Sequence, residues 1–211
     1  MNEFVSISPY VGFFLRTYTC PAITSLALSN CNVEELQLLG DFLDRSSPPL
    51  SSLRLRLFAI ERRDYKRQAL CVELLIACLR RCASLTTLII SVSTFPCDWD
   101  FGNQIVVALS RRFSGLLVAP KLEYLSLYAF HTATGVLKEL IAARWNAIPR
   151  SLRSVTLKEC TELYEYKPGC TRRHGFTASL DYDYSKTDVW KEVMGYVQDG
   201  LVFKCDGTSQ V

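Results

Sequence analysis

Apolar residues recur along the chain in a local pattern, apolar-x-x-apolar-x-apolar. The alternation at its end is the period of a strand with one buried face. The pattern occurs at five places, about 27 to 37 residues apart: Ile23-Leu26-Leu28, Leu50-Leu53-Leu55, Leu85-Leu88-Ile90, Leu122-Leu125-Leu127 and Leu152-Val155-Leu157. We therefore predict a short strand at each of the five.

Each of the first four predicted strands is followed by a segment whose apolar residues have helical spacing. These segments are VEELQLLGDFLDRSSPP, RQALCVELLIACLRRC, NQIVVALSRRFSGLLVAP and ATGVLKELIAARWNAIP. Asn32 is placed to cap the first helix, and residues 46–49 end it. The predicted apolar stripe of the second helix consists of Leu70, Leu74, Cys78 and Leu79.

The order of the elements is stronger evidence than the leucine spacing, because apolar residues are frequent and some matches arise by chance. Val33-Leu36-Leu38 is such a match, since it lies inside a helical pattern. Strand and helix alternate in a fixed order, which is typical of a repeat protein with an α/β fold. We predict an N-terminal segment at 1–22, about five strand-helix units at 23–160 and a C-terminal capping segment at 161–211.

The capping segment has its own pattern. FTASLDYDY alternates like a strand, and Thr187 can cap a helix that carries Trp190, Val193 and Val197 and stops at Gly200. LVF is a candidate last strand. Residues 1–22 show little amphipathicity, so we expect an exposed sheet edge at the N-terminal end of the repeats.

The repeat, with L-x-x-L-x-L-x-x-C in its best copies, resembles the leucine-rich-repeat region of F-box proteins. It looks most like the divergent F-box-like proteins of mushroom-forming fungi. Residues 20–204 carry this resemblance, in phrases such as ITSLALSNCNVEELQLLGDFL, APKLEYLSLYAF and IPRSLRSVTLKEC. It implies a ribonuclease-inhibitor-like solenoid with parallel strands on the concave side and helices on the convex side.

The same resemblance implies a protein–protein interaction module, and in one form the substrate-recognition part of an F-box-type ubiquitin ligase. Nothing before Ile23 resembles an F-box. A ubiquitin-ligase adaptor is therefore an expected partner only if an F-box precedes this chain, which would make the chain a receptor half. The alternative is a structural or regulatory repeat protein unconnected with ubiquitin.

Residues between and just after the strand leucines are expected to line the concave surface. Arg54, Arg56, Tyr124 and Tyr128 belong to residue types that are enriched at interface hot spots, and they flank Ile89. A peptide with acidic and apolar groups would suit such a surface. Ordinary solvated strand residues are the competing interpretation. The candidate contacts are Arg54, Arg56, Ile89, Tyr124, Tyr128 and Lys158, and Leu57 lies among the further positions considered.

Charge adds little to this picture. The chain has 24 basic and 21 acidic residues, a net charge of +3, which argues for neither nucleic acid nor a membrane as partner. The basic run ERRDYKRQ at 61–68 is expected on a loop or a first helical turn. No apolar run reaches the roughly 18 to 20 residues of a membrane span, and the N-terminus lacks a signal-peptide pattern. We expect an intracellular protein of the cytoplasm or nucleus.

Nine cysteines without a C-x-x-C pair favour buried, reduced thiols over a disulfide framework or a zinc site. Cys31 and Cys160 occupy the ninth position of the repeat, where we expect them to turn inward and meet unpaired backbone groups. We predict no cofactor, no metal and no catalysis. Two pairs were weighed as catalytic candidates and lack supporting partners: Asp181 with Asp183, and Cys170 with His174.

Overall fold

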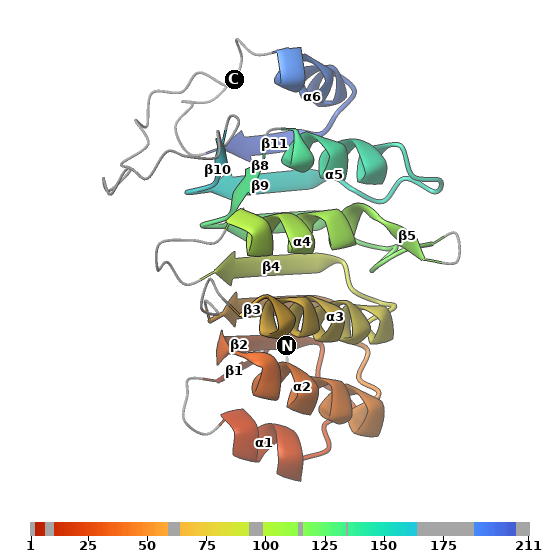
Figure 1. The fold of residues 1–211 in the computed structure, drawn as a ribbon. Helices are drawn as coiled ribbons and strands as arrows, with labels where there is room; N and C mark the ends of the chain where they lie inside the picture. Colours follow the sequence, from red (N-terminus) through yellow and green to blue (C-terminus); the bar gives the residue numbers. More distant parts are fainter. Residues whose placement is uncertain are drawn as a thin grey trace.

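The computed structural model describes residues 3–6, 11–58, 64–92, 99–113, 116–133, 135–163 and 188–205. Seven parallel strands form the main sheet, and their order in the sheet is their order along the chain (Figure 1). They are β1 (Glu3–Ser6), β2 (Ser25–Cys31), β3 (Ser52–Leu57), β4 (Thr87–Val92), β7 (Tyr124–Tyr128), β9 (Ser154–Lys158) and β11 (Val202–Cys205).

Helices alternate with these strands and lie in one layer in front of the sheet in Figure 1, each in contact with the next. They are α1 (Val11–Thr17), α2 (Val33–Ser46), α3 (Tyr65–Arg81), α4 (Trp99–Ser110), α5 (Val136–Trp145) and α6 (Asp188–Gln198). Two small pairs lie beside the main sheet: β8 (His131–Ala133) with β10 (Thr161–Leu163), and β5 (Arg112–Phe113) with β6 (Leu116–Leu117). The predicted α/β fold of alternating strands and helices is confirmed.

The apolar residues of the predicted strands lie in register across the sheet. Leu26, Leu53, Leu88, Leu125 and Val155 are consecutive Cα partners, and all are buried. A second row, two residues further along each strand, contains Leu28, Leu55, Ile90, Leu127 and Leu157. All five predicted strands are present, and the strand predicted from LVF pairs with β9 as β11. The helices bury these rows, so the core lies between sheet and helix layer.

The strand starts share one hydrogen-bond arrangement. At the entries of β3, β4, β7 and β9, two consecutive N–H groups donate to a single carbonyl of the preceding unit, at 2.8 to 3.1 Å. The pairs are Ser51 and Ser52 to Thr24, Thr86 and Thr87 to Ser51, Glu123 and Tyr124 to Thr86, and Arg153 and Ser154 to Glu123. This repeated contact fixes the register of one unit on the next.

Three of the strand ends are also alike. Asn30, Ala129 and Glu159, each the eighth residue of its repeat, have φ between 54° and 57°. Such left-handed residues turn the chain sharply. Beyond this turn Cys31 is buried, and the Cys160 thiol donates to the Leu127 carbonyl at 3.3 Å. The predicted inward turn of these two cysteines is confirmed.

Helix α2 begins at the predicted N-cap. The Asn32 side chain accepts from the backbone N–H of Glu34 and Glu35, and the Glu35 carboxylate accepts from the Asn32 N–H. This is a reciprocal capping box, which satisfies N–H groups that a helix start otherwise leaves unpaired. The helix ends at Ser46, where the sequence predicted its end.

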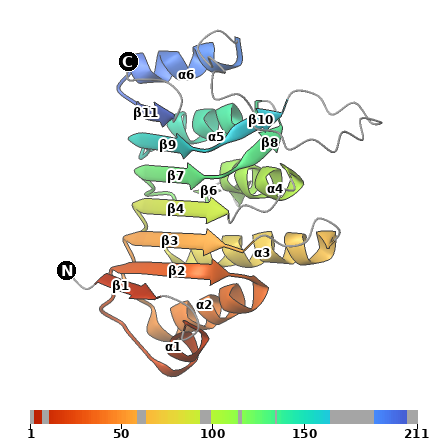
Figure 2. The same ribbon diagram turned by 90° about the vertical axis from the view of Figure 1, so that its left-hand side faces the viewer.

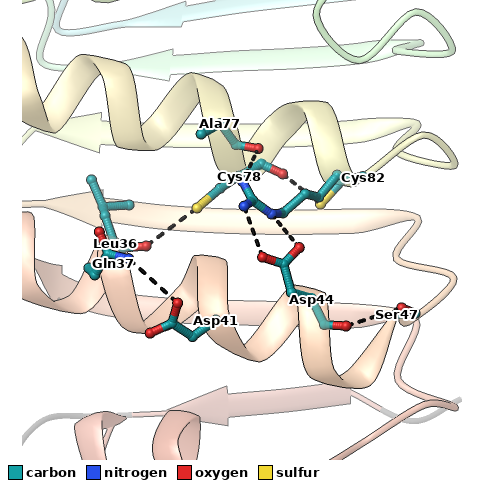
Figure 3. A network of polar contacts seen from close by, with 9 residues as sticks. Leu36, Gln37, Asp41, Asp44, Ser47, Ala77, Cys78 and Cys82 are labelled. Atoms are coloured by element: carbon teal, nitrogen blue, oxygen red, sulfur yellow. Dashed lines mark hydrogen bonds and ion pairs between the residues drawn. The ribbon is translucent and has the colours of Figure 1, made fainter.

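Side chains join α3 to α2 along their length (Figure 3). The Cys78 thiol donates to the Leu36 carbonyl at 3.4 Å inside the core. At the outer surface Arg81 binds both carboxylate oxygens of Asp44, at 2.6 and 2.9 Å, and lowers the pKa of that carboxyl. Near the other end of the helices, Nη2 of Arg67 donates to both carboxylate oxygens of Glu34, at 2.6 and 2.9 Å. One buried contact and two exposed ion pairs therefore join α3 to α2.

The N-terminal segment extends the sheet, so the expected exposed edge at β2 is wrong. Strand β1 pairs with β2 from Glu3 beside Ser25 to Ser6 beside Leu28. Helix α1 packs on α2, with the rings of Phe14 and Phe42 5.6 Å apart. A strand of four residues and a helix of seven are too short for their periodicity to be recognised in the sequence.

Two predicted helices differ from the structure in detail. In α3 the buried stripe contains Gln68 and Cys71, while Leu70, predicted to be buried, is 44% exposed. Because Gln68 is polar, the start of the true stripe was not recognised. Helix α4 ends at Ser110, before the predicted end of its segment. There the Ser110 hydroxyl donates to the Val107 carbonyl, which competes with continued helical bonding.

A buried arginine holds the end of α4. Arg144 of α5 is 3% exposed, and its Nη2 donates to the carbonyls of Leu109 and Val118, both at 2.9 Å. Its Nη1 lies 3.5 Å from the Ala119 carbonyl. Burial lowers the pKa of Arg144 to about 10, so the guanidinium remains charged at neutral pH. It joins α5 to α4 and to the chain that leads into β7.

We predict that Arg144→Met destabilises the fold by about 2 to 4 kcal/mol, because it leaves buried carbonyls without donors. Denaturation by urea, followed by circular dichroism, measures this free energy. Arg111→Met removes an exposed guanidinium beside the same helix end and should change stability by less than about 0.5 kcal/mol. Equal midpoints for the two variants would contradict the role given to Arg144.

Buried thiols make stability depend on alkaline pH. Burial raises the pKa of Cys31, Cys71 and Cys78 to about 12 and that of Cys82 to about 11, from an ordinary value of 9.0. Cys160 is raised to about 12 by the same cause. The unfolded chain therefore releases these protons at lower pH than the folded chain does.

We predict a free energy of unfolding that is insensitive to these thiols below pH 8 and falls as the pH rises from 9 toward 12. Each thiol contributes a slope of about 1.4 kcal/mol per pH unit in that window. Urea titrations in reducing buffer at several pH values measure the slope. Cys71→Ala removes one thiol, so its slope should be smaller by about that amount. An unchanged slope would show that Cys71 does not titrate in this way.

Candidate binding face

The sheet face opposite the helices is called the open face here. In Figure 2 strands β2, β3, β4, β7 and β9 are in view with no helix in front of them. Side chains on this face alternate with the buried rows and are exposed or half-buried. They are Ser25 and Ala27; Ser52, Arg54 and Arg56; Thr87, Ile89 and Ser91; Tyr124, Ser126 and Tyr128; Ser154, Thr156 and Lys158; and Val202 and Lys204.

The register arranges these side chains in three rows across the strands. The entry row contains Ser52, Thr87, Tyr124, Ser154 and Val202. The middle row contains Arg54, Ile89, Ser126, Thr156 and Lys204. The end row contains Arg56, Ser91, Tyr128 and Lys158.

All six residues predicted as contacts lie on the open face. Arg54 is the register partner of Ile89, and Arg56 shares the end row with Tyr128 and Lys158. Tyr124 lies in the entry row, four residues before Tyr128 along β7, and is 45% exposed. The structure thus brings the predicted residues onto one surface but distributes them over three rows and four strands.

Charge on six strands of this face, from β2 to β11, has one sign. Strands β2, β3, β4, β7, β9 and β11 contain no Asp or Glu, whereas Arg54, Arg56, Lys158 and Lys204 are exposed on them. The guanidinium groups of Arg54 and Arg56 have neither a hydrogen bond nor an ion pair with the described part of the chain. Within these strands the open face therefore presents cations that attract anionic groups.

The cations are separated by a neutral strip. Strands β4 and β7 carry hydroxyl groups, the two tyrosines and Ile89 on the open face, and no charge. Ile89 and Tyr128 are half-buried, so each leaves part of its apolar surface in contact with solvent. The strip can contact an apolar side chain, and its hydroxyls can bond a peptide backbone.

Sequence reasoning missed part of this face. The assignment of Leu57 to the binding surface is wrong, because this residue is fully buried in the core. Val202 and Lys204 were not recognised, although alternation within LVFK would have placed them together. Two pairs were candidates for catalysis, Asp181 with Asp183 and Cys170 with His174. Both lie outside the described residues.

The described ranges contain no group of three or more His, Cys, Asp or Glu side chains that could bind a metal ion. No helix within them has both the length and the apolarity needed to cross a bilayer. The basic run is described from Asp64 onward, where Asp64 caps α3 and residues 65–68 form its first turn, as predicted.

Comparisons with known proteins identify no relative: no protein-family model, no curated protein and no solved structure matches this chain.

Proposed function

We propose that this protein is a recognition module, without catalysis of its own, that binds acidic segments of other proteins on the open face. The observation that carries the proposal is the pair of exposed arginines, Arg54 and Arg56, on β3, a strand that contains no carboxylate and whose neighbours β2 and β4 contain none. Elsewhere in the described chain Arg67 and Arg81 bind carboxylates. Two guanidinium groups that lack such partners are suited to carboxylates from outside.

We further propose that the fold is a leucine-rich-repeat solenoid of the ribonuclease-inhibitor-like type. Three features recur from unit to unit and support this: in-register leucine rows, the paired donation at strand entries, and the left-handed turn before the ninth residue. In such a solenoid the strand side chains form the binding surface. The open face would be its concave side.

The resemblance to fungal F-box-like proteins gives this proposal a biological form. The chain would recognise substrates for a ubiquitin ligase in the cytoplasm or nucleus. Binding to the ligase adaptor would require an F-box, and no F-box pattern is recognisable in these 211 residues. A recognition role unconnected with ubiquitin fits the same face, because the residues of the face determine only which segment binds and not what happens to it afterwards.

We predict that replacing both arginines by glutamate, Arg54→Glu with Arg56→Glu, weakens binding to acidic peptides at least about ten-fold. Reversal replaces attraction between the arginines and the peptide carboxylates by repulsion. Fluorescence anisotropy with peptides selected from a random library on the native protein measures the affinity.

The matched control is Lys66→Glu with Arg111→Glu, which changes net charge equally at exposed positions of α3 and beyond α4. It should bind within about two-fold of the native protein. Circular dichroism confirms that both variants fold. Equal weakening in both would show that only net charge matters, and equal retention in both would exclude the open face.

A further inference from the structure

The cations of the open face form two groups on opposite sides of the neutral strip. Arg54 and Arg56 lie on β3, while Lys158 lies on β9 and Lys204 on the adjacent β11. Strands β4 and β7 lie between the groups. Neighbouring strands are about 4.8 Å apart, so the groups are separated by about 14 to 19 Å across the sheet.

We propose that the bound segment crosses the strands in extended form, with two acidic side chains about four to six residues apart and an apolar one between them. An extended chain advances about 3.3 to 3.6 Å per residue, which gives this separation. The first acidic group binds the arginines of β3 and the second binds the lysines of β9 and β11. The inference rests on the proposed function of the open face.

The neutral strip determines the middle of the ligand. Ile89 on β4 and Tyr128 on β7 are half-buried. Ser126 is the register partner of Ile89 and lies two residues before Tyr128 on β7. An acidic residue above this strip would lose water without gaining a cation. An apolar or aromatic residue would instead bury surface against Ile89 and the tyrosine ring.

The two groups differ in chemistry as well as in place. Arginine holds a carboxylate through two parallel N–H bonds, whereas lysine acts as a compact point charge. The β3 end should therefore impose a defined carboxylate geometry, and the lysine end should tolerate Asp and Glu equally. This difference favours one direction only for a segment whose two acidic residues differ.

A nucleic acid fits this distribution less well. A polynucleotide carries a phosphate at every residue, and some of these would lie over β4 and β7, whose open face has no cation. Discrete acidic side chains leave that strip neutral. The observations thus favour a peptide over a polyanion.

The test uses synthetic peptides in which two Glu residues lie two, five, seven or nine residues apart in the sequence, with one Phe between them. Proline in the spacer keeps the chain extended at about 3.1 Å per residue. Fluorescence anisotropy on the full chain measures each affinity. We expect the tightest binding when the two Glu residues are five residues apart, at least about ten-fold tighter than at two or nine.

Variants then assign the two ends. Both Arg54→Gln with Arg56→Gln and Lys158→Gln with Lys204→Gln should abolish the spacing optimum, while Lys66→Gln with Arg111→Gln should retain it. If affinity does not depend on the spacing of the two Glu residues but is lost in the β3 variant, the two-ended arrangement is overturned. The proposal that acidic segments bind on the open face would then still stand. No binding to any acidic peptide contradicts both proposals. Tighter binding of a single-stranded oligonucleotide of equal charge overturns the choice of a peptide.

Discussion

Burial of in-register apolar rows is the constraint on which the rest of the structure depends. A single strand with its helix cannot bury Leu53 and Leu55 by itself; neighbouring units on both sides enclose them. The paired N–H donation at the entries of β3, β4, β7 and β9 then fixes which residue lies beside which. A slip of one residue would turn leucines to solvent and arginines to the core. The positions of the open-face side chains therefore follow from the leucines behind them.

The helix layer gives this platform rigidity without taking part in the face. Arg81 and Asp44 are exposed, and an exposed pair contributes little stability. The orientation of α3 on α2 follows instead from their buried contacts, such as that of the Cys78 thiol with the Leu36 carbonyl. Inside the protein, Arg144 joins α5 to α4 by donating to the Leu109 carbonyl of α4 and to the Val118 carbonyl beyond it. A rigid scaffold reduces the entropy lost when a ligand binds, and it keeps charges on different strands at fixed distances.

Periodicity sufficed for the elements that are long and regularly patterned. The five strands, helices α2 to α5 and the last strand were all predicted, and so was the Asn32 cap. It failed where an element was short or its pattern irregular: β1 and α1 have too few residues, and the polar Gln68 conceals the start of the buried stripe in α3. These failures have a common physical cause, since packing against neighbouring units decides burial and a single segment does not contain its neighbours.

The candidate site shows the same division between local and long-range information. Arg54 and Arg56 could be named from one strand because alternation puts both on one side. Their relation to Lys158 and Lys204 could not, because it depends on the order of strands and on a register that joins residues about 100 to 150 positions apart. Helices of different lengths separate the strands along the chain, yet the sheet spacing stays constant. A repeat protein can thus change its loops and helices freely while it keeps the distance between two charged groups, and that distance is what an extended ligand would recognise.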